Sequence, residues 1–361
     1  MRIINDNALA PLRLRADSVT TMHLFCNDNA LALPMKFSTP VSLPPEAIRL
    51  TPQSRVMFIG SCFADHIGKH MAACLPPSQV CINPHGPLYN PVSIRNALVT
   101  YLPEAIAAPI HPDGFFQTQD GEWRHWEYST QFTAFSRQAL EAQLMTDWER
   151  TKNLFAQLDV LFITFSSDHA YWLEEGKFAH SCVANCHKQP SRLFSESVQE
   201  LKDMIYWWHY FLSDLHQELP QLKVVFTLSP FRYAKYGMHE SQLGKARLLL
   251  LIEEMQREFG CFVSYFPAYE IVCDELRDYR FYDSDMLHPS QQATDYVWER
   301  FRSWAFTPEL STYADERTAL LRALAHRPIN PHSEAHQAFL QKLEAKKQAF
   351  MRKYGEESLE V

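Results

Sequence analysis

Short apolar segments alternate with longer amphipathic segments through the middle of the chain. The short segments are residues 55–60, 80–83, 158–165, 222–228 and 261–266. Their length and their content of Val, Ile, Leu and Phe predict buried strands. Buried strands that are separated by long connections indicate a mostly parallel sheet with helices on both faces.

Apolar residues at helical spacing follow the first of these strands directly. After Gly60 and Ser61, the residues Phe63, Ile67 and Met71 recur every fourth position, which predicts a strand, a tight turn and a helix. Further helices are predicted over residues 195–218, 241–259 and 290–304.

This patterning divides the chain into three parts. We expect an irregular N-terminal extension over 1–49, an α/β domain over 50–305, and a helical C-terminal extension over 306–361 with a break near 327–328. Inside the α/β domain, residues 100–150 are rich in Trp, His and Phe but lack clear periodicity, which predicts an insertion or a lid.

Composition narrows the classes of partner. Lys plus Arg is 34 and Asp plus Glu is 42, so the net charge is 34 − 42 = −8, which argues against a nucleic-acid or anionic-membrane surface. No apolar run approaches the ~20 residues of a membrane span, and the first residues lack the apolar core of a signal peptide. Eight scattered cysteines without a signal favour reduced thiols, and we expect a cytoplasmic protein.

The first motif that could carry out catalysis is Gly60-Ser61-Cys62-Phe63-Ala64, at the junction of the first strand and helix. Ligands bind at the carboxyl ends of strands in open parallel sheets. A hydroxyl at a helix N-terminus lies among free N–H groups that favour developing negative charge. Ser61 therefore suits a nucleophile, and it suits a simple N-cap equally well.

The second motif is Asp285-Met-Leu-His288-Pro289, which follows the fifth strand. A serine nucleophile needs a base, and the base needs a carboxylate that fixes its tautomer. Asp285, three residues before His288, can supply that carboxylate, or it can cap a helix that begins near Pro289. No Gly-x-Ser-x-Gly elbow surrounds Ser61 or occurs elsewhere, which disfavours the usual α/β-hydrolase arrangement.

Taken with further blocks in the same order, these motifs resemble the GSCFA family, which is named for the residues at 60–64 and is similar to the SGNH (GDSL-like) hydrolases. The resemblance covers roughly residues 35–305. The other blocks that carry it are Asn83 to Pro91, Val183 to Lys188, Phe226 to Arg232, Lys245 to Leu249, and Tyr265 to Pro289.

The resemblance implies a three-layer α/β/α sandwich of flavodoxin-like type and a catalytic triad. By position in the blocks, Ser61 is the nucleophile, His288 the general base and then acid, and Asp285 the residue that orients the imidazole. The resemblance also implies an oxyanion hole, in which Gly86 matches the glycine of the second block.

The third block departs from the hydrolase pattern. After the strand that ends at Phe165, the chain reads Ser166-Ser-Asp-His169 in place of Gly-x-Asn-Asp. The third oxyanion donor is therefore either Ser167 or Asn185, and we favour Asn185 because its side-chain amide can donate a hydrogen bond.

A cysteine and a Cys/His cluster offer alternative chemistry. Cys62 lies in the first helical turn, where a thiol can be activated, although a small buried hydrophobe is the interpretation we favour. Residues 180–187 hold two His and two Cys, a set that zinc accepts, but their spacing fits no zinc finger. We expect the cysteines to pack, Asn185 and His187 to line the cleft, and no metal.

Several other polar residues are placed to line the same cleft. Arg232 follows a strand end, where it could bind a substrate carboxylate or phosphate. The aromatic stripe at 206–211 is expected to lie in the core. His85, His125, His169 and Tyr233 are weaker cleft candidates.

The sequence thus predicts a serine esterase that cleaves an O-acyl ester through an acyl-enzyme, with an O-acetyl carbohydrate as a plausible substrate class. An O-acyltransferase, and a non-catalytic binding protein on a degenerate hydrolase fold, remain alternatives. We expect no cofactor, and a small-molecule or carbohydrate ester as partner. The pattern gives no oligomeric state.

Overall fold

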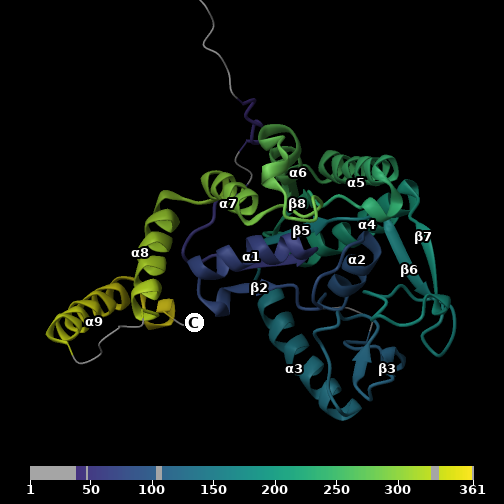
Figure 1. Ribbon diagram of the computed structural model, residues 1–361, viewed down its shortest axis with the longest axis horizontal. Coiled ribbons are helices and arrows are strands. Elements are labelled where there is room, and N and C mark those ends of the chain that lie inside the picture. The colour runs from purple at the N-terminus through teal and green to yellow at the C-terminus, as the bar shows by residue number, and fades with distance from the viewer. Residues whose placement is uncertain (1–37, 46–47, 103–107, 327–332, 360–361) are drawn as a thin grey trace, which may run out of the picture. The chain divides into compact units, whose positions relative to one another are not determined.

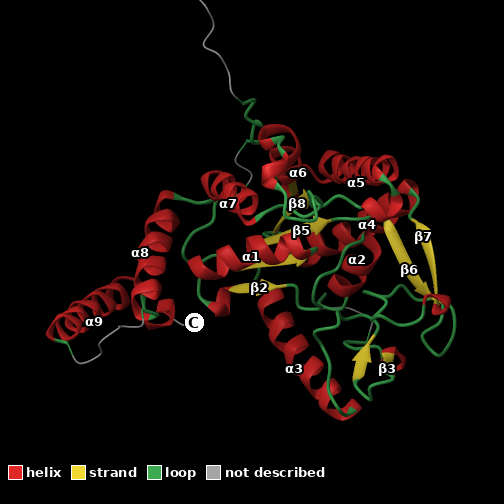
Figure 2. Cartoon of the chain, viewed as in Figure 1, coloured by secondary structure: helices red, strands yellow, loops and turns green. Residues whose placement is uncertain are grey.

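The computed structural model describes residues 38–45, 48–102, 108–326 and 333–359. A five-stranded sheet organises this part of the chain, with strand order β2-β1-β5-β8-β9 and every pairing parallel (Figure 2). All five predicted strands are confirmed. They are β1 (Val56–Gly60), β2 (Val80–Ile82), β5 (Val160–Phe165), β8 (Lys223–Leu228) and β9 (Val263–Tyr265).

Helices cover both faces of the sheet, as the three-layer prediction requires (Figure 1). One face packs against α2 (Pro91–Val99), α4 (Leu201–Glu218) and α5 (Met238–Phe259). The other face packs against α1 (Cys62–Cys74), the single turn α6 (Ala268–Glu270) with the π-helix Ile271–Leu276, and α7 (Gln291–Ala305).

The alternation of side chains along β1 explains how the strand serves two cores. Met57 and Ile59 belong to the core under α2, α4 and α5, while Val56 and Phe58 belong to the core under α1 and α7. Successive residues of a strand point to opposite faces, and both faces of this sheet are covered by helices. All four side chains are therefore buried. This is why β1 reads as a continuous apolar run.

The segment 100–150 contains more regular structure than its sequence predicted. Strands β3 (Phe115–Gln117) and β4 (Trp123–His125) form an antiparallel hairpin, and α3 (Arg137–Phe155) is a helix of 19 residues. Few side chains of α3 are buried, so its apolar stripe is too narrow to show as helical periodicity.

The predicted helix 195–218 is wrong at its start. Residues Phe194–Val198 form β7, which pairs antiparallel with β6 (His169–Leu173), and α4 begins only at Leu201. The prediction that the stripe at 206–211 lies in the core is also wrong in part. Trp208 and Phe211 are buried, whereas three neighbouring aromatic side chains are about half exposed, namely Tyr206, Trp207 and Tyr210.

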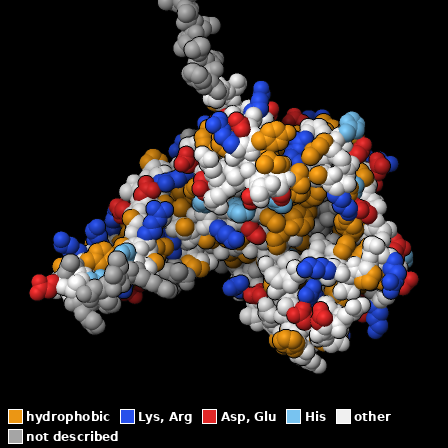
Figure 3. Space-filling model, viewed as in Figure 1, with side chains coloured by type: hydrophobic (Ala, Val, Ile, Leu, Met, Phe, Trp, Pro, Cys, Tyr) orange, Lys and Arg blue, Asp and Glu red, His pale blue; other side chains and the backbone are white. Residues whose placement is uncertain are grey.

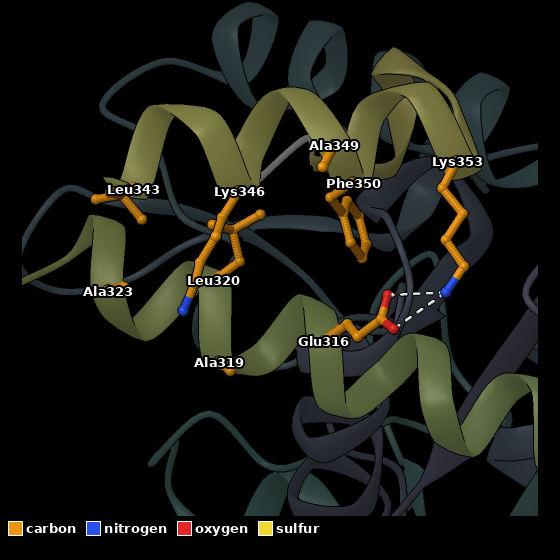
Figure 4. Close-up of a pocket in the computed structure, with 9 residues that line it drawn as sticks. All are labelled: Glu316, Ala319, Leu320, Ala323, Leu343, Lys346, Ala349, Phe350 and Lys353. Carbon is orange, nitrogen blue, oxygen red and sulfur yellow. Dashed lines mark hydrogen bonds and ion pairs between the residues drawn. The ribbon is translucent and has the colours of Figure 1, made fainter. Parts of the chain in front are cut away.

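The C-terminal extension is helical, as predicted, and consists of α8 (Pro308–Leu324) and α9 (Glu334–Tyr354). The predicted break near 327–328 lies outside the described residues. A groove of about 460 Å³ separates the two helices; Leu320, Leu343 and Phe350 face it, and Lys353 forms an ion pair with Glu316 at one end (Figure 4). No helix in the described ranges has the length and apolar character that a bilayer crossing requires.

Residues 38–50 were expected to be irregular, and the described ones hold no helix or strand. They nevertheless fasten the start of the domain to its end. Glu275 accepts a hydrogen bond from Val41 N at 2.8 Å, and Arg300 lies 3.6 Å from the same carboxylate. Leu50 N donates to Ala305 O at 2.8 Å, at the end of α7. We call residues 38–45 and 48–50 the N-terminal strap.

Candidate functional site

The loops that follow the strands of a parallel sheet meet at one edge, and most predicted site residues lie in these loops. Ser61 follows β1, Gly86 follows β2, Ser167 follows β5 and Arg232 follows β8. The Asp285–His288 loop comes after β9 and the π-helix, just before α7.

The geometry of the turn after β1 explains why a glycine precedes Ser61. Gly60 has φ +139°, and a Cβ at this position would lie 2.2 Å from the carbonyl oxygen of Thr164 on β5. Only glycine allows the two strands to approach so closely. The N–H of Ser61 then donates to the same Thr164 oxygen at 3.3 Å.

Ser61 is the N-cap of α1, and its Oγ accepts a hydrogen bond from Phe63 N at 3.3 Å. Only 2% of Ser61 is exposed. The N-cap interpretation is therefore met by the structure. It does not exclude the nucleophile, because both roles place the hydroxyl at the positive end of the helix.

The remaining motif residues divide between contacts and packing. Cys62 Sγ lies 3.2 Å from the hydroxyl of Tyr89, in the loop after β2. Phe63 and Ala64 are buried in the core that includes Phe58. Each position of the motif thus has its own structural requirement.

Asn83 positions this turn, and the sequence analysis did not single it out. Its Oδ1 accepts from Gly60 N at 2.7 Å, and its Nδ2 donates to Asp65 Oδ1 at 2.5 Å. Its backbone has φ +42°, a conformation that asparagine tolerates better than most residues. The Asn-Pro at the end of the second strand is a turn signal that could have drawn attention to it.

Asp285 and His288 form a tightly bonded pair. Asp285 Oδ2 lies 2.5 Å from His288 Nδ1, while Oδ1 accepts from the backbone N–H groups of Leu287 at 2.8 Å and His288 at 2.9 Å. These hydrogen bonds, that from the His288 backbone foremost, lower the pKa of Asp285 to about 2. The structure brings the two residues together; their catalytic role stays a prediction.

The loop that carries this pair packs on the loop after β8. Arg232 N donates to Leu287 O at 3.2 Å, and the ring of Phe231 lies 4.3 Å from the ring of His288. Burial and then Lys69 lower the pKa of His66 on α1. The two contacts anchor the loop of His288 to the loop after β8.

The hydrogen bond that would complete a triad is not formed. Within the described ranges, no hydrogen bond joins Ser61 to His288, and Ser61 Oγ has Phe63 N as its partner. The imidazole is half exposed, with 54% of its side chain accessible. The structure thus shows the carboxylate–imidazole half of the predicted triad and leaves the serine–imidazole half a prediction.

The predicted oxyanion donors are differently placed. The N–H of Gly86 donates to Asn83 O at 2.7 Å within a turn where Gly86 has φ +74°. Ser167 Oγ accepts from His169 N at 3.1 Å, and Ser167 N donates to Tyr89 O at 2.9 Å. An oxyanion would have to displace the turn hydrogen bond before it could use Gly86.

Asn185 lies in the connection between β6 and β7. Its Oδ1 accepts from His187 N at 2.7 Å, and the preceding Ala184 donates to Trp126 O in the loop after β4. The structure thus ties this connection to segment 100–150. Its predicted contact with an oxyanion stays a prediction.

His187 and Cys182 of the Cys/His cluster are buried. His187 is 2% exposed, its ring contacts those of Phe116 and Trp126, and neither ring nitrogen has a hydrogen-bond partner among the residues that the structure describes. Burial lowers the pKa of His187 to about 4 and raises that of Cys182 to about 12. Among the described residues, no three His, Cys, Asp or Glu side chains are grouped so as to hold a metal ion.

Two of the weaker candidates are buried. His85 stacks on Tyr128 at 4.2 Å, and Nε2 of His125 donates to His111 O at 2.9 Å. Burial lowers their pKa values to about 4 and about 3, respectively, so both are neutral at pH 7.

His169 and Tyr233 are held by neighbouring side chains. His169 pairs with Glu196 at 3.0 Å, and Tyr233 donates to Ser166 Oγ at 3.2 Å. Tyr233 thereby joins the loops after β8 and β5.

Lys245 is a second residue that the sequence analysis did not identify as part of the site. It is 1% exposed, and its Nζ donates to Ser166 O at 2.6 Å and to Ser229 O at 2.7 Å. It therefore ties the loop after β5 to the loop after β8. Burial lowers the pKa of Lys245 to about 7.

Arg232 keeps a cation at this edge. Its Nη1 donates to the hydroxyl of Tyr269 at 3.2 Å. In the described part of the chain, no carboxylate forms an ion pair with Arg232, so its charge is available to an anionic group.

Comparison with known proteins gives distant structural likenesses and two family matches. A family two carbohydrate esterase from Clostridium thermocellum, solved in complex with cellohexaose, is similar with a TM-score of 0.33 and 10% identity. The likeness covers 73% of this chain and 66% of that one, so the chain spans slightly less than two thirds of the esterase. No curated protein matches.

The family matches cover most of the described chain. A model of the GSCFA family matches residues 55–301, which include the sheet and every predicted triad residue. A model described as "GSCFA domain protein, C-terminal domain" matches residues 318–360, which include the end of α8 and all of α9. With more than half of its length matched, the chain belongs to the GSCFA family.

Proposed function

We propose that this protein is a serine esterase of the SGNH type that cleaves an O-acyl ester through an acyl-enzyme. The observation that carries the proposal is the Asp285–His288 pair. Its carboxylate fixes Nδ1 of an imidazole that is half exposed, on a loop that packs on the loop after β8. That leaves Nε2 to take a proton from a nucleophile, as in other serine hydrolases.

In the proposed reaction, Ser61 Oγ attacks the ester carbonyl while His288 takes its proton. The tetrahedral oxyanion forms at the N-terminus of α1, where the helix dipole favours negative charge, and the Ser61 N–H contributes once it leaves the carbonyl oxygen of Thr164. His288 then protonates the leaving alcohol, and the acyl group stays on Ser61. Water, deprotonated by His288, releases the carboxylic acid and restores the serine.

The remaining donors are proposed from their positions. Gly86 and Asn185 would add hydrogen bonds to the oxyanion, each worth ~3 kcal/mol in comparable sites. Gly86 can do so only after its N–H leaves Asn83 O, so the proposal includes a local rearrangement of that turn. Arg232 would bind an anionic part of the substrate.

The substrate class follows from access to the nucleophile. Ser61 is 2% exposed, so little space surrounds the position where an acyl group would sit. A small acyl group such as acetyl fits this constraint. We propose an O-acetyl group on a carbohydrate as the substrate, with an alcohol acceptor in place of water as the variant that would make the protein an acyltransferase.

A non-catalytic binding protein is the second candidate. Two observations favour it: Ser61 Oγ is engaged with Phe63 N, and the Gly86 N–H is engaged with Asn83 O. In that case Ser61 and Gly86 would serve only to maintain the fold and the geometry of the turns.

Labelling separates these candidates. We expect a fluorophosphonate probe to modify the purified protein, and p-nitrophenyl acetate to be hydrolysed, with both lost in Ser61→Ala. The matched control is Ser136→Ala, which removes an equivalent N-cap from α3. If neither the wild type nor Ser136→Ala is labelled between about pH 6 and 9, a range in which a triad histidine titrates, the result would favour the non-catalytic binding protein.

A further inference from the structure

A pocket of about 250 Å³ lies beside the β6–β7 hairpin, where α2 and α4 pack together. We call it the hairpin pocket. The figures show α2 and the hairpin on the same side of the domain, and hydrophobic side chains gather on that face (Figure 3). Its lining combines tryptophans with polar side chains, the key ones being Arg95, Trp172, Gln199, Asp203, Trp207 and Trp208.

Three lining residues carry buried polar atoms without a hydrogen-bond partner in the described structure. These atoms are Arg95 Nε, Gln199 Oε1 and Trp208 Nε1. Gln199 is 7% exposed and Trp208 is 1% exposed, so bulk water does not solvate them freely. Buried polar groups are normally hydrogen-bonded, so three unpaired polar atoms around one pocket are unusual, and a ligand that reaches them would complete their hydrogen bonds.

The donor or acceptor character of these three unpaired atoms defines the polar groups that a ligand should carry. The N–H groups of Arg95 and Trp208 can donate, and Gln199 Oε1 can accept. The amide of Gln199 is held in place, because its Nε2 donates to Asp168 O at 3.2 Å. A ligand with several hydroxyl groups meets donors and acceptors together, since a hydroxyl can serve as either.

The apolar part of the lining adds flat surfaces. Trp207 is 51% exposed, and the guanidinium of Arg95 lies 4.9 Å from its ring centre. Trp172 is fixed by a hydrogen bond from its Nε1 to Ser197 Oγ at 2.8 Å. Exposed tryptophan faces suit a partner that is apolar on one side and polar at its edges.

Charge and size narrow the choice further. The lining contains one guanidinium, that of Arg95, and two carboxylates, those of Glu200 and Asp203, so its charge does not select for an anion. The volume lies below the roughly 300–1,000 Å³ of sites for drug-sized ligands. A single small ring therefore fits better than a nucleotide.

We propose that the hairpin pocket binds one neutral pyranose unit of a carbohydrate, with the sugar's apolar face against tryptophan and its hydroxyls on Arg95, Gln199 and Trp208. This inference is independent of the proposed esterase activity. The residues that carry it do not include Ser61, Asp285 or His288.

Titration of the full chain with simple glycosides tests the proposal. The probes are the methyl glycosides of glucose, galactose and N-acetylglucosamine, followed by calorimetry and by saturation-transfer NMR. We expect at least one to bind with a Kd in the millimolar range, which corresponds to about −4 kcal/mol. Binding should be unchanged in Ser61→Ala, even if that variant has lost all esterase activity.

A matched pair of variants locates the binding. Trp207→Ala should weaken it at least about tenfold, while Tyr210→Ala should not, although both side chains are 51% exposed on α4 and only Trp207 lines the pocket. Circular dichroism checks that both variants fold. Equal effects of the two substitutions, no binding by any glycoside up to about 50 mM, or binding of inorganic phosphate instead of sugar would each overturn the proposal.

Discussion

The carboxylate of Asp285 holds His288 at two points, through Nδ1 of the ring at 2.5 Å and through the backbone N–H at 2.9 Å. A carboxylate that grips both the ring and the backbone restricts the imidazole to one tautomer and one orientation. The same arrangement would be needed if His288 serves as a general base.

Asp285→Asn should lower kcat/KM for ester hydrolysis by about 10²–10⁴-fold, because an amide can stabilise the wrong imidazole tautomer. The hydrogen bonds to Asp285 lower its pKa to about 2, so it is ionised throughout the neutral range. The ratio of wild-type to variant activity should therefore be constant from about pH 5 to 9. Asp283→Asn, on the same loop, is the control, and an equal loss in both variants would contradict the assignment.

Cys62→Ala should retain both hydrolysis and fluorophosphonate labelling. Its Sγ contacts the Tyr89 hydroxyl at 3.2 Å, and removal of that contact leaves Ser61 in place at the helix N-terminus. Mass spectrometry of the labelled peptide identifies the modified residue. Label on Cys62, with Ser61→Ala still active, would move the nucleophile to the cysteine.

Acyl chain length should matter because Ser61 is nearly inaccessible. We expect kcat/KM to fall at least about tenfold from p-nitrophenyl acetate to the butyrate, a loss of ~1.4 kcal/mol in transition-state binding. Initial rates on the acetate, butyrate and octanoate measure this. A rate that rises with chain length would refute the small acyl site.

Gly86→Ala should destabilise the protein more than Gly176→Ala. Both glycines have positive φ, +74° and +91°, but a Cβ at Gly86 would lie 1.9 Å from Ser129 Oγ while one at Gly176 would meet nothing within 4 Å. Backbone strain alone costs about 1 kcal/mol, and overpacking adds about 1–3 kcal/mol. Urea unfolding measures both variants, and similar midpoints would show that the turn relaxes freely.

Lys245 should make stability rise with pH above neutrality. Burial lowers its pKa to about 7 in the folded protein, whereas an unfolded lysine titrates near 10.4, so between these values the unfolded state binds more protons. The free energy of unfolding therefore increases with pH in this window, by up to about 1 kcal/mol per pH unit.

In Lys245→Met that increase should disappear, and in the exposed control Lys202→Met it should remain. Thermal unfolding between about pH 7 and 9.5 measures how the free energy of unfolding of each variant changes with pH. This pH range lies roughly within the titration window of the buried lysine. A slope in Lys245→Met equal to that of the wild type would show that another group is responsible.

The sheet could be predicted from sequence because its central strands β1, β5 and β8 are buried on both faces and so appear as apolar runs. The hairpin β6–β7 and the helix α3 could not, because they lie at the surface. In β7, Phe194 is half-buried while the other residues are exposed, and α3 buries only a narrow stripe that includes Leu140 and Leu144. Patterning detects an element only where burial is extensive.

The candidate site shows a similar division. Ser61 and the Asp285–His288 pair could be found because their chemistry depends on residue type and short spacing. Asn83 and Lys245 could not, since each acts by reaching a loop far away in sequence: Asn83 contacts Gly60, and Lys245 contacts Ser166 79 residues away. Such roles depend on tertiary structure, which local sequence does not encode.

The N-terminal strap contacts the α/β domain, although it lies before residue 55, where the family match begins. A fragment cut at residue 50 would lose Val41, and with it one partner of Glu275, a carboxylate whose side chain is 3% exposed. It would also lose Pro44 O, which accepts a hydrogen bond from the Trp304 indole. A unit that keeps both contacts therefore starts no later than Val41, upstream of the family match.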